Sequence, residues 1–261
     1  MGRVIAIASQ KGGVGKTTTA INLGACIAQE GHRVLLIDID PQGNASSGLG
    51  INGNDRSVTV YEVLLGQNEM NEACTPTALA NLDLVASGQR LSGAEVELVG
   101  MMARETRLKS AIIKVRDEYD FILVDSPPSL GLLTINALTA ADSVLIPLQC
   151  EYLALEGLTQ LIGAIRLVQD HLNPGLRIEG VLLTMYDARL NLSQQVAEEA
   201  RKFFSERVYR TLVPRNVKLS EAPSFGKPIV LYDPHCAGAE SYRDLAREVL
   251  ERASEGAWTR A

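Results

Sequence analysis

The segment best suited to chemistry is glycine-rich and lies within the first twenty residues. It reads Lys11-Gly12-Gly13-Val14-Gly15-Lys16-Thr17-Thr18, directly after an apolar run at residues 4–8. Glycines let the backbone turn so that several N–H groups face one anion, and a following helix adds the positive end of its dipole. Lys16 would reach the β- and γ-phosphates of a nucleotide, and the Thr17 hydroxyl would ligate Mg²⁺. These residues predict a phosphate-binding loop.

The loop departs from the common phosphate-binding pattern at one position. Aligning Gly15-Lys16-Thr17 on G-x-x-x-x-G-K-[ST] places Gln10 where the first glycine usually stands. An extra lysine, Lys11, comes directly after it. The alternative is a chance glycine-rich turn with two surface lysines. That alternative does not explain the apolar run before the motif and the helix-forming run after it, which are the context that the motif requires.

Aspartates follow two further apolar runs. Asp38 and Asp40 come after residues 34–37, and Asp125 comes after residues 121–124. Pro41 stops the first of these strands, so Asp38 and Asp40 are expected at its carboxyl end. A strand that ends in aspartate downstream of a phosphate loop commonly holds Mg²⁺ through its water shell. Each aspartate could instead cap the next helix, but the phosphate loop favours a role in metal binding.

The elements that must position these residues alternate along the chain. Strands are expected at residues 3–8, 34–38, 82–86, 120–125, 143–148 and 178–184. Helices are expected near residues 16–29, 57–65, 93–117, 131–140, 154–171, 191–205 and 238–254. The strands are continuous apolar runs, as in a parallel sheet that is covered on both faces. The pattern predicts a doubly wound α/β fold with a mainly parallel sheet flanked by helices and with ligands at the carboxyl ends of the strands.

Composition predicts a cytoplasmic protein with a single domain over residues 1–261. The chain has 261 residues, a net charge of −6 and no Pro/Gly/Ser-rich linker. We find no apolar run of membrane-spanning length and no signal peptide before the first strand. The four cysteines are widely spaced and are expected to be reduced, without a disulfide framework or a metal site.

Together these residues resemble the ParA/MinD group of P-loop ATPases, whose phosphate loop follows the pattern K-G-G-x-x-x-K-[ST] seen at residues 11–17. Residues 38–44, 184–189 and 214–224 are similar to the ParA branch, and most similar to its short chromosomal partition ATPases of the Soj/ParA type. The resemblance covers residues 3 to about 252. It implies a P-loop NTPase fold of the deviant Walker A type, with ATP and Mg²⁺ as cofactors.

The resemblance also implies a role for each matching residue. In this family the residues at 11–18 bind the nucleotide, and the lysine that matches Lys11 crosses an ATP-dependent homodimer interface to the partner's phosphates. Gly12 and Gly13 would permit the close approach. Residues matching Lys11, Lys16 and Asp40 serve hydrolysis, in which Asp40 positions the water. The Mg²⁺ ligands would be Thr17, Asp40 and Asp125, and the adenine-binding surface would comprise Met185, Pro214 and Asn216.

Hydrolysis is expected to be slow and to act as a timer. Phosphoryl transfer depends on charge stabilisation and on a positioned water, and Asp40 alone holds water only modestly. The resemblance implies that a ParB-type centromere-binding protein stimulates hydrolysis.

Residues 187–227 contain eight basic and five acidic side chains in a chain of net charge −6. On charge alone, a solvated mixed face is the better interpretation. The resemblance instead implies double-stranded DNA binding without sequence preference, at the nucleoid. The expected contacts are Arg189, Arg215 and Lys218. Such affinity would rest on counterion release and would fall steeply with salt.

Three alternatives remain within this family. A MinD-like division-site ATPase would bind membrane through a basic amphipathic C-terminal helix, which the mixed charge of residues 251–261 fits poorly. An iron–sulfur reductase would need cysteines soon after Asp125, and this chain has none there. A ParA-like ATPase that positions another cargo would have the same chemistry, so the sequence does not separate it from a partition ATPase.

Overall fold

The computed structural model describes residues 1–151 and 154–254, and among them eight strands form one sheet. Their order is β3-β4-β2-β5-β1-β6-β7-β8, and every neighbouring pair is parallel except β3 and β4. The strands are β1 (Arg3–Ile7), β2 (Val34–Asp38), β3 (Cys74–Pro76), β4 (Leu82–Val85), β5 (Phe121–Asp125), β6 (Ser143–Gln149), β7 (Arg177–Tyr186) and β8 (Val208–Pro214). The predicted α/β class with a mainly parallel sheet is confirmed.

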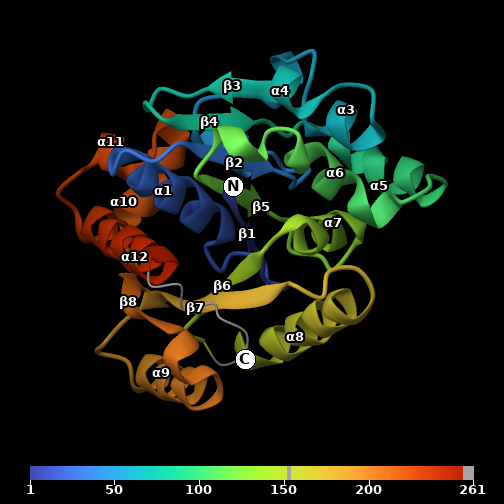
Figure 1. Ribbon diagram of the computed structural model, residues 1–261. Coiled ribbons are helices and arrows are strands. Elements are labelled where there is room, and N and C mark those ends of the chain that lie inside the picture. Colours follow the sequence, from blue (N-terminus) through green and yellow to red (C-terminus); the bar gives the residue numbers. More distant parts are fainter. Residues whose placement is uncertain (152–153, 255–261) are drawn as a thin grey trace.

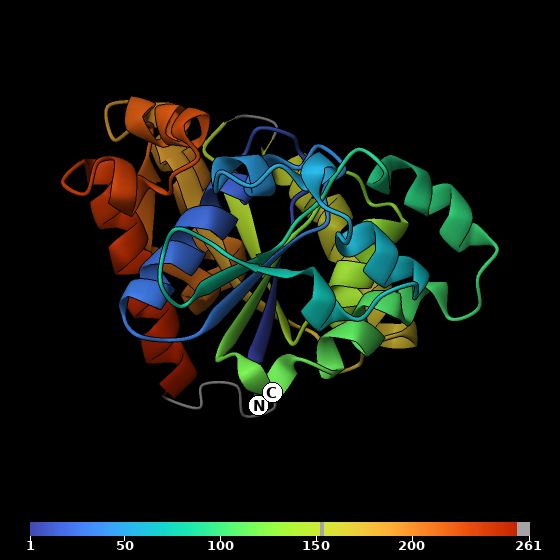
Figure 2. The same cartoon turned by 90° about the horizontal axis from the view of Figure 1, so that it is seen from above.

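Helices cover both faces of the sheet (Figure 1), and the same layers stand on either side of the twisted strands in Figure 2. One layer holds α1 (Lys16–Gln29), α10 (Val217–Glu221), α11 (Ile229–Tyr232) and α12 (Ala237–Ser254). The other holds α3 (Val60–Leu65), α5 (Leu91–Val99), α6 (Arg107–Ile113), α7 (Leu132–Ala140) and α8 (Ala154–His171). Two separate apolar cores result, and β2 and β5 are buried at every residue. This double cover explains why the strands are continuous apolar runs.

Shorter elements complete the connections. Helices α2 (Asn44–Gly48) and α4 (Met70–Ala73) follow β2 and α3, and α9 (Asn191–Phe204) packs beside β7 and β8.

The structure differs from the expected elements in several places. The helix predicted over 93–117 is wrong as one element, because α5 ends before Gly100 and Ala103 adopts a left-handed φ of 53° before α6 begins. The helix expected from residue 57 begins at Val60, where Thr59 and Glu62 form a capping box. Strands β3 and β8 were not predicted, and β3 is a three-residue edge strand that pairs antiparallel with β4.

The sheet topology brings the candidate residues to one place. Strand β5 lies between β1 and β2, with Asp125 in register with both Ile7 and Asp38. The loop after β1, the loop after β2 and the loop after β5 therefore leave the same edge of the sheet, side by side. This edge is the one at which parallel α/β sheets bind their ligands.

Candidate nucleotide-binding site

The phosphate loop connects β1 to α1 and has left-handed backbone at Gly13 (φ 74°) and Gly15 (φ 89°). These are the positions that require glycine, whereas Gln10 is outside the left-handed region, so a side chain is tolerated there. Gly15 precedes the first turn of α1, and the Thr184 hydroxyl of β7 donates a hydrogen bond of 2.8 Å to the Val14 carbonyl. The loop is thus fixed to β7, with the N-terminal N–H groups of a 14-residue helix beside it.

The two lysines of the loop have different surroundings. Lys16 is buried, and its Nζ donates to the Lys11 carbonyl at 3.3 Å. Burial lowers the pKa of Lys16, and the charges of Asp125 and Asp40 oppose that shift. The Lys11 side chain is 34% exposed and lies 3.6 Å from Glu151. Lys16 therefore faces the interior of the site, while Lys11 lies at its surface.

Asp125 is a buried carboxylate whose hydrogen-bonding capacity is not met by the surrounding protein. Neither of its oxygens makes a well-formed hydrogen bond with the described part of the chain, although the Thr17 side chain lies nearby. Burial and the charge of Asp38 raise the pKa of Asp125 well above its usual value, while Thr17 and Lys16 nearby favour the charged form. A buried carboxylate without hydrogen bonds is costly unless a cation or a donor completes it.

This arrangement fits Mg²⁺ bound together with a nucleotide. Mg²⁺ prefers oxygen ligands and is usually held by one or two carboxylates together with substrate phosphates and water. In residues 1–151 and 154–254, no group of three or more His, Cys, Asp or Glu side chains is placed to hold a metal on its own. Thr17 and Asp125 would hold the ion against the phosphates, where it would neutralise charge that develops during phosphoryl transfer.

Asp38 and Asp40 lie at the end of β2, as expected from Pro41. Asp38 is fully buried, and burial raises its pKa to about 6. Asp40 is 6% exposed, and its Oδ1 accepts a hydrogen bond of 2.9 Å from the Gln42 N–H. Of these two residues, Asp40 is the one that keeps some exposed surface.

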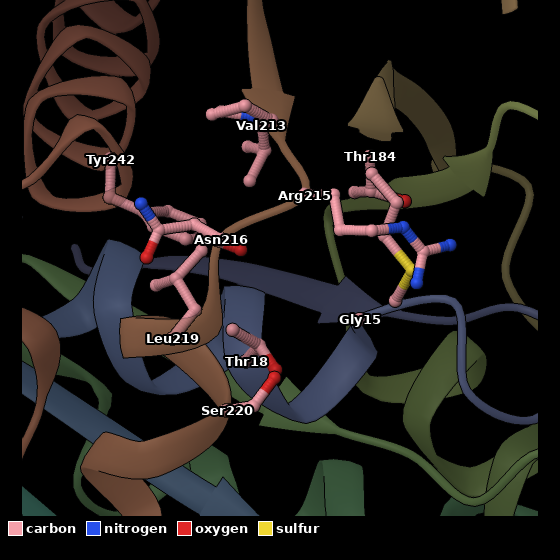
Figure 3. Close-up of a pocket in the computed structure, with 11 residues that line it drawn as sticks. Gly15, Thr18, Thr184, Val213, Arg215, Asn216, Leu219, Ser220 and Tyr242 are labelled. Carbon is pink, nitrogen blue, oxygen red and sulfur yellow. The ribbon is translucent and has the colours of Figure 1, made fainter. Parts of the chain in front are cut away.

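A pocket lies beside the phosphate loop, and its lining includes Met185, Pro214 and Asn216, which we expected around adenine. Figure 3 shows Asn216 and Leu219 facing Thr18 of α1 across this pocket, with Gly15 and Arg215 on its other side. Sequence reasoning assigned no ligand contact to the other lining residues, which come from four elements: Thr184, Val213, Leu219, Ser220 and Tyr242. Three of them, Thr184, Leu219 and Ser220, lie in the stretches that are similar to the ParA branch, and that similarity is the signal that could have located them.

The three residues expected to contact DNA lie on the loops and helix that continue from this pocket. Arg189 follows β7, is 88% exposed and pairs with Asp187 at 2.7 Å. This pairing lowers the pKa of Asp187 to about 2. Lys218 lies in α10 and pairs with Glu221 at 2.9 Å. Arg215 itself lines the pocket and lies 3.6 Å from Glu151.

Within the described ranges, no helix is both long enough and apolar enough to cross a membrane. Residues 255–261, whose composition argued against a membrane-binding tail, lie outside the described residues.

Comparison with known proteins places the chain in a family. A family model described as an AAA domain matches residues 2–178. The chain is 61% identical to the sporulation initiation inhibitor protein Soj of Bacillus subtilis over 249 residues, covering 95% of this chain and 98% of that protein. It is 57% identical to the chromosome partitioning protein ParA of Myxococcus xanthus over 252 residues, covering 97% and 89%.

A solved structure has the same fold as this chain. Cobyrinic acid a,c-diamide synthase from Mycobacterium smegmatis, with bound ADP and magnesium, superposes with a TM-score of 0.87 at 38% identity, covering 98% of this chain and 97% of that one. A second structure of that synthase holds an ATP analogue and magnesium. The predicted resemblance is thereby confirmed. The chain belongs to the ParA/Soj family of P-loop ATPases.

Proposed function

We propose that this ATPase partitions chromosomes by binding DNA in an ATP-dependent manner. We also propose that residues 1–261 form one ATPase domain. ATP binding brings two subunits together, and the dimer binds double-stranded DNA of the nucleoid without sequence preference. Slow hydrolysis, stimulated by a ParB-type partner, returns monomers that do not bind. The relative named as a chromosome partitioning protein, ParA of Myxococcus xanthus at 57% identity, supports this function.

The observation that supports the proposal best is that the pocket and the basic residues belong to the same two segments of the chain. Met185 and Arg189 belong to the end of β7 and its loop, while Asn216 and Lys218 belong to the loop after β8 and to α10. The Asn216 side chain caps α10 by accepting a hydrogen bond of 2.8 Å from the Lys218 N–H. A nucleotide in the pocket would therefore act directly on the segments that carry the candidate DNA contacts.

Gly12 supports the dimeric part of the proposal. Its φ lies outside the left-handed region, and a Cβ added there would meet nothing within 4 Å in the described chain. Neither backbone conformation nor packing inside this subunit requires glycine at this position. Close approach of a second subunit explains it, and the neighbouring Lys11 lies at the surface, where a partner's phosphate could replace Glu151.

Binding to plain DNA tests the proposal most directly. We expect sedimentation to show DNA binding with Mg²⁺-ATP and little with ADP or without nucleotide, with affinity that falls steeply as salt rises. Arg189→Glu should weaken binding to all sequences by about tenfold or more and leave ATP-dependent dimers intact. Arg247→Glu is the matched control, because Arg247 is also exposed and pairs with a neighbouring carboxylate, Asp244 at 2.9 Å. Strong sequence preference, or equal loss in both variants, would contradict the proposal.

Two further variants separate dimerisation from hydrolysis. Asp40→Ala should abolish hydrolysis and preserve ATP-dependent dimers, because it removes the water-positioning carboxylate and leaves the phosphate loop intact. Lys11→Ala should impair both hydrolysis and dimerisation while ATP still binds the monomer. Analytical ultracentrifugation with ATP, together with phosphate release, measures both properties. Normal turnover in Asp40→Ala would rule out its assigned role.

A further inference from the structure

Two serines outside every motif connect the candidate catalytic loop to the neighbouring strand. Ser46 lies in α2, after β2, and Ser87 follows β4. Each is 1% exposed, and neither belongs to the phosphate loop or the pocket beside it. Strand β4 pairs with β2 on the side away from β5 (Figure 1). Because Ser87 follows β4, it contacts Asp40 from that side of β2.

These serines close a ring of hydrogen bonds around the Asp40 backbone. The Ser87 hydroxyl donates to the Asp40 carbonyl at 2.6 Å, and the Ser87 N–H donates to the Ser46 hydroxyl oxygen at 2.9 Å. The Ser46 hydroxyl in turn donates to Asp38 Oδ2 at 2.7 Å, and the Ser46 N–H donates to the same oxygen at 2.8 Å. The Asp40 N–H donates to Asp38 Oδ1 at 3.1 Å and completes the ring.

The chemistry of the ring requires a hydroxyl at both positions. The Ser46 oxygen accepts one hydrogen bond and donates another, and the Ser87 side chain must donate to a carbonyl. Alanine at position 46 would leave the buried Ser87 N–H without its partner. Alanine at position 87 would remove one of the two hydrogen bonds to the Asp40 carbonyl, which would keep only the bond of 2.9 Å from the Gly43 N–H and hold the segment less firmly. The Gly53 backbone packs closely against Ser87, because a Cβ added to Gly53 would lie 1.6 Å from the Ser87 carbonyl oxygen.

We infer that Ser46 and Ser87 are positioning residues for ATP hydrolysis, which act by holding the backbone of Asp40 so that its carboxylate meets the attacking water. This inference rests on the role proposed for Asp40. Both backbone polar groups of Asp40 lie in the ring, while its carboxylate receives only the Gln42 N–H among the described contacts. The ring therefore fixes the main chain and leaves the carboxylate available. Small displacements of a catalytic group reduce the rate strongly without preventing binding.

The test compares Ser46→Ala and Ser87→Ala with Ser47→Ala. Ser47 is the matched control because it lies in the same helix, is exposed, and its hydroxyl bonds only the Asn44 carbonyl at 3.3 Å among the described contacts. We expect kcat for ATP to fall about tenfold in each ring variant, with ADP affinity within about twofold of the parent. Ser87→Thr, which keeps the hydroxyl, should recover most of the rate, and Ser47→Ala should match the parent. Thermal unfolding of each variant shows that it is folded.

A parent-like kcat in both ring variants would overturn the inference. Equal losses of kcat and ADP affinity would also overturn it, because they would show that the ring stabilises the whole site and not Asp40 in particular.

A double variant tests whether Ser87 acts through Asp40. In the Asp40→Ala background, Ser87→Ala should not lengthen the lifetime of ATP-bound dimers further, and a further increase would contradict the inference. If Asp40→Ala hydrolyses ATP normally, the proposed role of Asp40 itself is wrong. If Asp40→Ala is inactive but both serine variants are fully active, Asp40 keeps its role and only the role of the serines is wrong.

Discussion

The structure buries carboxylates both beside the edge strand β8 and at the carboxyl end of the sheet, and their surroundings differ. Beside the middle of β8, Glu248 is 3% exposed, and its Oε1 accepts from the Arg210 N–H at 3.0 Å and from Arg252 at 2.8 Å. Its Oε2 accepts from the Thr211 N–H at 3.2 Å and hydroxyl at 3.0 Å. At the carboxyl end, Asp125 is fully buried, and both of its oxygens lack hydrogen bonds within the described residues.

The difference separates a structural carboxylate from a functional one. A fully hydrogen-bonded charge such as Glu248 holds α12 against β8, and removing it would leave its partners buried and unpaired. A buried carboxylate such as Asp125 is costly in the ligand-free protein, and Mg²⁺ with its nucleotide would offset that cost if it binds there as we propose. The unmet hydrogen-bonding capacity is therefore a measure of how much binding can stabilise the site.

Asp125→Asn should have the largest effect. We expect ATP hydrolysis to fall by about 100-fold or more, because the amide removes the anionic Mg²⁺ ligand. The thermal midpoint of the nucleotide-free protein should stay the same or rise, because an unpaired buried charge is removed. Phosphate release and thermal unfolding measure the two effects. A marked loss of stability without nucleotide would show that Asp125 is structural in the same sense as Glu248.

Glu248→Ala should destabilise the fold without changing the chemistry. We expect the free energy of unfolding to fall by about 3 kcal/mol, since the Arg252 guanidinium and two backbone N–H groups would lose their partner. Urea denaturation measures this loss, and kcat per folded molecule should equal that of the parent. Glu251→Ala is the control, because Glu251 pairs with Arg210 at 2.8 Å on the exposed side of the same helix. Equal losses in the two variants would show that burial does not set the difference.

Removing Mg²⁺ should lower the stabilisation by ATP only in proteins that keep Asp125. At a 100-fold excess over its dissociation constant, Mg²⁺-ATP should stabilise the parent by about 2.7 kcal/mol. Chelation with EDTA should reduce this gain in the parent and in Glu251→Ala, and it should have little effect in Asp125→Asn. Thermal shifts with ATP, with and without Mg²⁺, measure the gain. An equal response to chelation in all three proteins would contradict the assignment of Asp125 to the metal.

Ser143→Ala should have the smallest effect. The Ser143 hydroxyl donates to the buried Glu179 at the amino end of the sheet, where Arg3 also pairs with that carboxylate. Losing one of these contacts should lower the free energy of unfolding by about 1 kcal/mol and leave hydrolysis unchanged. Urea denaturation and phosphate release provide the measurements. A change in kcat here would mean that the two ends of the sheet are coupled.

Much of the fold could be predicted from the sequence because its strongest signals are local. The continuous apolar runs located six of the strands, and the glycines and lysines of residues 11–18 located the loop between the first strand and the first helix. The edge strand β3 escaped prediction because three residues carry no periodicity. The break between α5 and α6 escaped because the left-handed Ala103 has no side-chain signature.

The site was predictable only in part, for a similar reason. The expected adenine residues Met185, Pro214 and Asn216 line one pocket, and their roles stay predictions that binding measurements can check. Tyr242 joins the same pocket from α12, and its sequence neighbours form an ordinary amphipathic helix that gives no sign of a ligand. Pairings such as Lys11 with Glu151 connect residues that are distant in sequence, so no spacing rule could propose them.

By itself, the sequence determined the family, the order of the main strands and helices, and the residue types able to bind phosphate and Mg²⁺. These properties depend on short-range patterns of glycine, charge and hydrophobicity. Only the tertiary structure decided which buried carboxylates have hydrogen-bond partners and which lack them. It also decided which serines form hydrogen bonds around the Asp40 backbone. Those properties depend on burial and hydrogen-bond geometry between strands that are adjacent in the sheet and far apart along the chain.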